Sequence, residues 1–291
     1  TFECSDPLVN QLQKNIVWGQ RGNYLDIPTD CPQRDERLGW TGDAQVFVRT
    51  ATYNMDIASF FAKWLNDLND SQFDDGRYPH VAPTSPSEKG GGSPAWADAG
   101  IICPWVIYQV YGDVRTLRTH YGGMKRWMEY QQSKADGCIS KLWGFGDWLN
   151  TNASTPGDLI ATALFAHTSR LMARIAAVLG KADDSAFYTK QYERICEQFN
   201  EEFVTPSGRL IGNTQTAAVL ALHFDLLPEQ KRKHAVEFLV EDIKRRHVHL
   251  STGFVGTPYI NHVLTRFGQT RTAYDLLFAK NWASFLYAVT K

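Results

Sequence analysis

The sequence predicts an all-α protein whose helices pair into hairpins and form a toroid. Apolar residues recur at helical spacing along most of the 291 residues, and the alternation typical of strands is nearly absent. Glycines punctuate the joints between the helical stretches, which pair at intervals of about 40 to 60 residues. No stretch repeats strictly in sequence, so a solenoid of identical repeats is disfavoured.

The first long helical pattern begins near Asp43. Apolar residues follow at i, i+3, i+4 and i+7 spacing as far as Leu68, as in an amphipathic helix. Thr41 is the expected N-cap, which places Asp43 in the first turn, where the helix dipole favours a negative charge. Further helices are expected over residues 98–111, 114–132, 158–180, 184–203, 213–225, 228–245, 254–267 and 270–280.

Two long segments, residues 70–97 and 137–157, separate these helices and are rich in Gly, Pro, Ser and Trp. Long segments without secondary structure in a compact helical protein are usually functional. DGRYPHVAPTSPSEKGGGSPAWAD is expected to be either a lid or rim of a pocket or a flexible excursion. No linker-like change of composition occurs, which favours one domain over the whole chain.

The composition is that of a globular protein, with 43% hydrophobic and 21% charged residues. A net charge of −1 offers no basic field for nucleic acid and no polybasic patch for a membrane surface. No apolar run approaches the roughly 18 to 20 residues that span a bilayer, and the first residues do not resemble a signal peptide. The five cysteines are scattered without a CxxC pair, which predicts mostly free, buried thiols.

Residues 26–45, DIPTDCPQRDERLGWTGDAQ, combine charged residues with rigid punctuation. Pro28 and Pro32 fix the backbone and lack an amide donor, so residues 27–33 cannot lie inside a helix. The acids of this segment therefore lie on a shaped loop, and loops held by a scaffold often carry chemistry. The segment holds five acids, of which Asp30, Asp35, Glu36 and Asp43 are the ones placed on this shaped loop.

Hydrolysis of a glycosidic bond requires two carboxyl groups at a pocket, one acting as an acid and one activating water or attacking carbon. Within this segment, Glu36 is the best candidate for the acid. It lies beside Arg34 and Arg37 and close in sequence to the other acids. The alternative is a cluster of helix caps and salt bridges that only fixes the loop.

Three loops carry a tryptophan, namely Trp40 in LGW, Trp96 in GGGSPAWAD and Trp148 in WGFGDWLN. Sugars present apolar C–H faces and hydroxyl edges, so a saccharide site needs aromatic platforms next to acidic acceptors. Trp96 with Asp98 and Trp148 with Asp147 both offer that pair. The alternative is that each tryptophan belongs to the core.

No metal centre is predicted. His247 and His249 in HVHL have no acidic partner at metal-ligand spacing. The glycines at 90–92 follow no strand and precede no Lys–Ser/Thr pair, so they are a weak candidate for a phosphate-binding loop.

These segments resemble the α-L-rhamnosidases of glycoside hydrolase family 78. Residues 26–45 match a specific signature of that family, and the likeness covers nearly the whole chain through FECSDPLVNQL, DGRYPHVAP, GFGDWL, TQTAAVLAL and STGFVGTPYI. The resemblance implies an (α/α)6 barrel, in agreement with the toroid predicted from periodicity. It also implies an inverting hydrolase that removes terminal α-L-rhamnose from glycans or glycosides and needs neither a metal nor an organic cofactor.

The resemblance also implies roles for individual residues. Glu36 matches the general acid of the family. Trp96 and Trp148 match the aromatic walls of the rhamnose pocket. The residues expected to bind substrate are Asp30, Arg34, Trp40, Asp43, Trp96, Asp147 and Trp148.

The general base of the family is a Glu in a WER-like motif that would follow NWASFLYAVTK, where this sequence ends at Lys291. We therefore expect residues 1–291 to be a single (α/α)6 catalytic domain that stops before its last helices and lacks the flanking β domains. Two alternatives stay open: another (α/α)6 glycosidase with a different sugar specificity, and a sugar-binding remnant without activity. A bacterial protein is expected, with a periplasmic, secreted or cytoplasmic location and an oligomeric state that the sequence does not predict.

Overall fold

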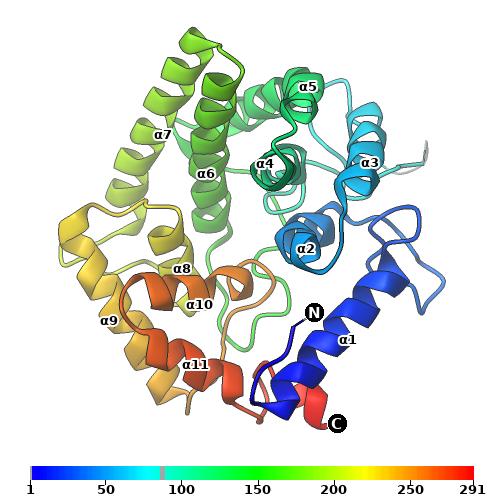
Figure 1. The fold of residues 1–291 in the computed structure, drawn as a ribbon. Helices are drawn as coiled ribbons and strands as arrows, with labels where there is room; N and C mark the ends of the chain where they lie inside the picture. Colours follow the sequence, from blue (N-terminus) through cyan, green and yellow to red (C-terminus); the bar gives the residue numbers. More distant parts are fainter. Residues whose placement is uncertain (1, 86–88) are drawn as a thin grey trace. The chain divides into compact units, whose positions relative to one another are not determined.

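The computed structural model describes residues 2–85 and 89–291, and α-helices joined by loops make up nearly all of their regular secondary structure (Figure 1). Residues 86–88, in the segment expected to be a lid or an excursion, lie outside the described residues. The described part confirms the all-α prediction, because its only strands are β1 (Ala135–Asp136) and β2 (Ile139–Ser140). Its eleven α-helices are α1 (Pro7–Asn23), α2 (Thr41–Asn54), α3 (Ala58–Asp70), α4 (Ala99–Tyr111), α5 (Val114–Ser133), α6 (Gly157–Val178), α7 (Ala182–Phe203), α8 (Gln215–His223), α9 (Glu229–Arg245), α10 (Thr257–Arg266) and α11 (Thr270–Phe278).

The chain forms two compact units. The first comprises residues 1–19, 146–163 and 199–291, and the second comprises residues 20–145 and 164–198. The division falls within helices α1, α6 and α7. The expectation of a single domain over residues 1–291 stays a prediction.

Helix α4 is the central helix of the second unit. Its sequence, AGIICPWVIYQVY, is apolar on nearly every side, which is the pattern of a helix enclosed by others. Helices α2, α3 and α5 pack against it. The buried indoles nearby are also hydrogen-bonded: Trp64 Nε1 donates to the carbonyl of Ala82 at 3.0 Å, and Trp127 Nε1 donates to Asp98 Oδ1 at 3.0 Å. Buried Trp rings commonly find such partners because an unpaired N–H is costly in the core.

Helix α8 is the corresponding enclosed helix of the first unit. All residues from Gln215 to Leu222 are buried, and α9 and α10 pack against this helix. The Thr214 hydroxyl accepts a hydrogen bond from the Ala217 amide at 3.1 Å and so caps the helix. Each unit therefore contains an enclosed, apolar helix, α4 in the second unit and α8 in the first.

Helix α1 is the element that the sequence pattern does not predict. Its start is marked by Asp6, whose Oδ1 accepts hydrogen bonds from the amides of Leu8 at 2.8 Å and Val9 at 3.2 Å. Pro7 occupies the first helical position, where its missing amide hydrogen costs nothing. An Asp–Pro pair in this setting is the signal that could have identified the helix.

The single helix predicted from Asp43 to Leu68 is wrong, because two helices occupy this stretch. Met55 adopts an extended conformation and ends α2. Asp56 then accepts a hydrogen bond from the amide of Ala58 at 3.1 Å, and the Ile57 amide donates to the Tyr111 hydroxyl at 2.9 Å. The apolar spacing continues across this break, so periodicity alone cannot detect it.

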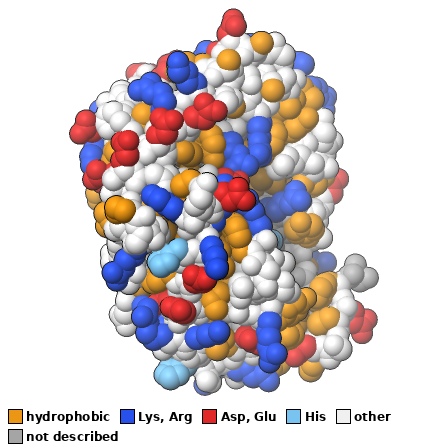
Figure 2. Space-filling model, turned by 90° about the vertical axis from the view of Figure 1, so that its left-hand side faces the viewer, with side chains coloured by type: hydrophobic (Ala, Val, Ile, Leu, Met, Phe, Trp, Pro, Cys, Tyr) orange, Lys and Arg blue, Asp and Glu red, His pale blue; other side chains and the backbone are white. Residues whose placement is uncertain are grey.

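The cysteines form no disulfide bonds, and the described residues on the face drawn in Figure 2 form no patch of a single charge. All five cysteines are free as predicted, although only Cys103 and Cys138 are buried. No helix among residues 2–85 and 89–291 is long and apolar enough to cross a membrane. On the face drawn in Figure 2, acidic and basic side chains are interspersed, in keeping with a net charge of −1.

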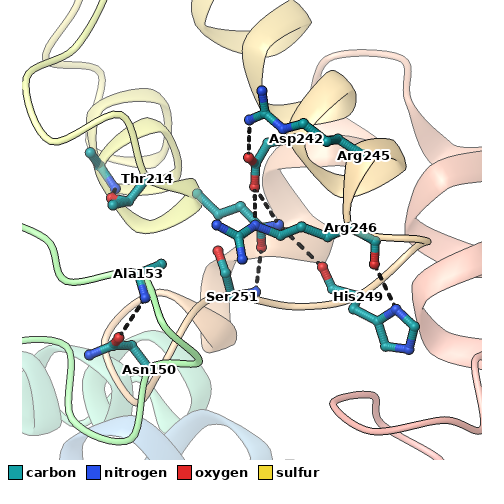
Figure 3. A network of polar contacts seen from close by, with 10 residues as sticks. Asn150, Ala153, Thr214, Asp242, Arg245, Arg246, His249 and Ser251 are labelled. Atoms are coloured by element: carbon teal, nitrogen blue, oxygen red, sulfur yellow. Dashed lines mark hydrogen bonds and ion pairs between the residues drawn. The ribbon is translucent and has the colours of Figure 1, made fainter.

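A buried polar network fixes the segment that follows α9 in the first unit (Figure 3). Asp242 is only 2% exposed and accepts hydrogen bonds from Arg245, from Arg246 at 2.8 Å and from Gln215 at 3.0 Å. Gln215 also donates to the carbonyl of His249 at 3.2 Å and accepts from the amide of Ser251 at 2.9 Å. The enclosed helix α8 therefore anchors residues 249–251 through one glutamine.

We expect this network to make stability depend on pH. Burial acts to raise the pKa of Asp242, but the hydrogen bonds from Arg245, Arg246 and Gln215 outweigh it, so the pKa lies below its usual value. Because the folded-state pKa is lowered, the stabilisation is present above pH 4 or so and is lost as the pH falls through the folded-state value. Asp242→Asn should lower the free energy of unfolding at pH 7 by about 1.5 to 3 kcal/mol.

Urea denaturation at several pH values tests this expectation. The deficit of the variant should shrink as the pH falls below about 4. Glu241→Gln, at the exposed neighbouring position on α9, is the matched control and should unfold like the parent protein. A deficit of equal size at pH 7 and pH 3 would contradict the proposed origin of the effect.

Candidate active site

The loop between α1 and α2 is held in shape by its own backbone. Tyr24 and Pro28 form an isolated antiparallel bridge, and the Asp30 amide donates to the carbonyl of Leu38 at 3.0 Å. As expected from the two prolines, residues 27–33 are not helical. The hydrogen bond from Asp30 to Leu38 brings the two ends of the DCPQRDERL stretch together, so the side chains between them extend from a closed loop.

Glu36 is held by two different donors on this loop. Trp40 Nε1 donates to Glu36 Oε1 at 2.6 Å, and the Arg34 guanidinium forms a salt bridge with Glu36 Oε2. Arg34 also lies 3.6 Å from Asp30 Oδ2. Glu36 thus contacts two of the predicted substrate-binding residues, Trp40 and Arg34, and Arg34 connects it to a third, Asp30.

Asp30 and Asp43 are the acids of this group whose surroundings are the least like water. The Asp30 side chain is 8% exposed, and its Oδ1 is buried without a hydrogen-bond partner. Burial raises the pKa of Asp43 to about 6, and the negative charges of Asp30 and Glu36 add to this effect. The amide of Asp43 itself, in the first turn of α2 as predicted, acts in the opposite direction. Three carboxyl groups therefore share one neighbourhood.

The start of α2 is attached to a strap formed by residues 78–82. The expected N-cap, Thr41, is wrong by one residue: the N-cap is Trp40, which makes no capping hydrogen bond with its side chain. The Thr41 hydroxyl donates instead to the carbonyls of Pro79 at 3.2 Å and His80 at 3.0 Å, and its amide donates to the His80 carbonyl at 2.9 Å. Tertiary contacts with the strap have replaced the local cap.

Phe145 is the centre of an aromatic cluster in the second unit. Its ring centroid lies 6.0 Å from Trp40, 5.0 Å from His80 and 4.6 Å from Trp96. Trp96 is only 4% exposed and lies against Gly42, where a Cβ atom would be 2.6 Å from the indole nitrogen. Gly42 therefore lets the Trp96 loop approach the start of α2. Phe145 and His80 were not among the predicted site residues, although both lie in segments that carry the family resemblance.

The acid beside Trp96 has a structural role rather than the expected role of a sugar acceptor. Asp98 is fully buried, and its oxygens accept from the amide of Ala95 at 2.8 Å and from Trp127 Nε1 at 3.0 Å. Burial raises the pKa of Asp98 to about 6, while these two hydrogen bonds lower it. Ala95 has a positive φ of 66°, so the carboxyl group holds the strained turn that precedes Trp96.

Asp147 organises a loop in the first unit. It is 3% exposed, and it accepts hydrogen bonds from the Thr216 hydroxyl and from the amides of Gly253 at 2.7 Å, Val255 at 2.9 Å and Gly256 at 3.2 Å. Both carboxylate oxygens are occupied, which favours a role in positioning the loop. The assignment of Asp147 to substrate binding stays a prediction.

Trp148 is the exposed aromatic residue of the same loop, with 51% of its surface accessible. Its carbonyl accepts a hydrogen bond from the amide of Phe254 at 2.8 Å. A Cβ atom at Gly253 would lie 2.2 Å from that carbonyl oxygen, so the glycine permits the contact. The GDWL and STGFVG segments thus form one hydrogen-bonded structure.

The second unit brings together six of the eight predicted residues, namely Asp30, Arg34, Glu36, Trp40, Asp43 and Trp96. Asp147 and Trp148 belong to the first unit. That the loop of Glu36 and the loops of Trp96 and Trp148 converge at one end of the helical barrel stays a prediction. Among residues 2–85 and 89–291, no group of three His, Cys, Asp or Glu side chains is arranged to hold a metal ion.

Asp43→Asn should change how stability varies with pH. The pKa of Asp43 is raised from 3.8 to about 6 on folding, so its ionised form destabilises the folded state. That cost is absent below pH 4 or so and grows until the pH exceeds about 6, where it should reach about 2 to 3 kcal/mol. Denaturation from pH 4 to pH 7 should therefore show the variant gaining stability relative to the parent as the pH rises.

The matched control for Asp43 is Asp26→Asn. Asp26 lies on the same loop, but its side chain is 83% exposed. This control should follow the pH dependence of the parent protein. If Asp43→Asn also follows it, Asp43 does not carry the buried charge inferred here.

Asp147→Asn should loosen the loop that contains Gly253. An amide NH₂ in place of a carboxylate oxygen would face backbone N–H donors, so at least one hydrogen bond to a charged group is lost, at about 1.5 to 3 kcal/mol each. The amides of residues 253–256 should exchange with solvent faster. Thr216→Val, which removes one donor to Asp147, should give a smaller effect in the same amides. Unchanged exchange in both variants would rule out the positioning role.

Comparison with known proteins identifies the family. The bacterial alpha-L-rhamnosidase 6 hairpin glycosidase domain matches residues 1–291. The chain is 46% identical over 290 residues to an alpha-L-rhamnosidase of Streptomyces avermitilis, and 42% identical over 300 residues to one of Formosa agariphila. All of this chain is covered in both matches, but only 28% and 32% of those two proteins.

Solved structures agree with the sequence comparison. The crystal structure of the Streptomyces avermitilis alpha-L-rhamnosidase complexed with L-rhamnose superposes on all of this chain with a TM-score of 0.97, using 28% of its own length. The Aspergillus terreus enzyme, at 34% identity, gives a TM-score of 0.95 and also covers the whole chain with 35% of its length. These matches confirm the helical-hairpin architecture that was predicted as an (α/α)6 fold. The chain therefore belongs to the family of α-L-rhamnosidase six-hairpin glycosidase domains.

Proposed function

We propose that this chain forms the glycosidase domain of an inverting α-L-rhamnosidase, which releases terminal α-L-rhamnose from rhamnosides with Glu36 as its general acid. The observation that carries the proposal is the clamped Glu36 carboxyl group, which lies beside Asp30 and Asp43 on the loop with the most specific family signature. Further support comes from the rhamnose complex of the Streptomyces avermitilis relative.

The contacts of Glu36 suit a group that gives up a proton. Trp40 and Arg34 both donate to its oxygens, so they stabilise the carboxylate that remains after the leaving oxygen has been protonated. The Arg34 side chain is exposed, so this contact can yield when the proton is on the carboxyl group. Trp40 supplies the fixed contact and Arg34 the adjustable one.

Asp30 and Asp43 are proposed to bind sugar hydroxyl groups. An oxygen buried without a partner, such as Asp30 Oδ1, costs about 1 to 3 kcal/mol, and a hydroxyl donor from the sugar would remove that cost. Asp43 titrates at about pH 6, so below that pH it can donate a hydrogen bond as well as accept one. Arg34, between Asp30 and Glu36, offers guanidinium donors to the same ring.

The aromatic residues are proposed to receive the apolar side of the sugar. Trp40 and Trp96 meet at Phe145 next to the acids, and rhamnose presents C–H groups and a methyl group to such a surface. Trp96 is buried, so it supports the other rings more than it offers a face of its own. Trp148, which is exposed, is proposed as a further platform for the substrate.

An inverting mechanism also needs a carboxylate that activates water, with about 6.5 to 9.5 Å between the two carboxyl groups. We propose no residue of this chain for that role. If the complete protein bound rhamnose but released none, it would bind sugar without hydrolysing it. If it released a sugar other than rhamnose, it would be a glycosidase of another specificity.

Glu36→Gln in the complete protein separates acid catalysis from sugar binding. The variant keeps the shape of the side chain but has no transferable proton, and general-acid help contributes about 10² to 10⁴ in rate. A natural rhamnoside has an alcohol leaving group that needs this proton, whereas a dinitrophenyl rhamnoside leaves as a stable phenolate. The variant should therefore lose far more kcat/KM on the natural substrate than on the activated one.

Asp35→Asn is the matched control, because Asp35 is the exposed neighbour on the same loop. It should retain kcat/KM on both substrates. Equal losses on both substrates in Glu36→Gln would mean that Glu36 only binds sugar. Absence of activity in the complete parent protein on any rhamnoside would contradict the proposed function itself.

A further inference from the structure

His80 lies against the tryptophan that holds Glu36. The His80 and Trp40 rings are nearly parallel, with an interplanar angle of 11° and centroids 6.3 Å apart. Phe145 approaches both rings, with centroid distances of 5.0 Å to His80 and 6.0 Å to Trp40. The indole of Trp40 is thus held in its plane by the imidazole on one side and by the Phe145 ring at an angle of 75°.

The imidazole is itself held at two points. Its Nε2 lies 2.7 Å from the hydroxyl oxygen of Ser93, which is fully buried. Its backbone carbonyl accepts from the Thr41 amide at 2.9 Å, and its amide donates to the carbonyl of Gly90 at 3.1 Å. The strap therefore fixes both the backbone and the ring of His80 relative to the first residue of α2.

We propose that His80 is a positioning residue for Glu36 and acts through Trp40. With Ser93, it sets the plane of the Trp40 indole, whose N–H holds Glu36 Oε1 at 2.6 Å. This inference rests on the proposed function of Glu36 as the general acid. A misplacement of about 1 Å at a reacting group can cost around 100-fold in rate, so a ring that only supports Trp40 can still matter to turnover.

The direction of the effect follows from what Trp40 contacts. Loss of the His80 imidazole leaves space beside the Trp40 indole. The indole can then tilt, which moves its N–H away from the Glu36 carboxylate. The acid would lose its alignment with the leaving oxygen, while the hydroxyl-binding acids Asp30 and Asp43 would keep their places on the loop and on α2. Turnover of substrates that need the acid should suffer, and binding of the sugar ring should not.

The test compares His80→Ala with His80→Phe in the complete protein. His80→Ala should lower kcat on a rhamnoside with an alcohol leaving group by about 10- to 100-fold with little change in KM. On a dinitrophenyl rhamnoside, which needs little acid help, the loss should be much smaller. His80→Phe keeps a flat ring beside Trp40 and should restore most of the turnover, and Ser93→Ala should fall between the two.

His234→Ala on α9 is the matched control, because this histidine is exposed and belongs to the first unit. It should leave both substrates unaffected. Thermal unfolding and binding of free L-rhamnose should be close to those of the parent in every His80 variant that is compared. If His80→Ala fails to fold, the other two variants still test the proposal. Ser93→Ala should then lose more turnover than His80→Phe on the rhamnoside with an alcohol leaving group.

A second measurement does not depend on hydrolysis. The indole N–H resonance of Trp40, assigned by its loss in Trp40→Phe, reports the hydrogen bond to Glu36. It should shift in His80→Ala and in Glu36→Gln but remain nearly in place in His80→Phe. An unshifted resonance in His80→Ala overturns the proposal, as do equal losses on both substrates or a rise in KM alone. If the parent hydrolyses no rhamnoside, the proposed function fails, and the resonance still decides whether His80 positions the indole.

Discussion

The hydrogen bonds between the start of α2 and the strap of residues 78–82 are the constraint on which the candidate site depends. The Thr41 amide and hydroxyl both reach the His80 carbonyl, and the Ala82 amide donates to the carbonyl of Gly39 at 2.9 Å. Trp40 and Val81 form a bridge between these contacts. Together they place Trp40 at a fixed point, from which its N–H reaches Glu36. A local N-cap on α2 would have satisfied the helix end equally well, but it would have left the strap unattached.

The buried acids of the two units fall into two groups according to how their oxygens are used. Asp98, Asp147 and Asp242 have both oxygens engaged by amides, hydroxyls, indoles or guanidinium groups. Through these hydrogen bonds, each of the three acids fixes a turn or a loop. Asp30 differs, because one of its oxygens is buried without a partner, at a cost that folding alone does not recover. Such an oxygen could accept a hydrogen bond from a hydroxyl-rich ligand, whereas the oxygens of the other three acids already have partners within the protein.

The loops of the candidate site are held by contacts with buried helices and buried side chains rather than by secondary structure of their own. In the second unit, Asp98 immediately precedes the buried helix α4 and supports the turn before Trp96. In the first unit, Gln215 on α8 anchors residues 249–251, and Asp147 then holds residues 253–256. Both arrangements let a segment without regular structure keep a defined shape. An exposed ring such as Trp148 can then be presented by a fixed backbone.

The helical class, the positions of most helices and the loop that holds Glu36 could be predicted from the amino-acid sequence, because apolar periodicity and proline placement are local properties of the chain. The resemblance in residues 26–45 also selected the acids and Trp40, which the structure places together. That Asp98 and Asp147 hold their own loops is visible only in the folded chain, since the hydrogen bond from Trp127 to Asp98 spans 29 residues and those from Gly253 and Val255 to Asp147 span more than 100. The separation of α2 from α3 also appears only in the structure. The same holds for the packing of His80 and Phe145 against Trp40 and for the contact of Ser93 with His80. His80 and Phe145 contact Trp40, and Ser93 contacts His80, across separations in the chain that no local pattern reveals.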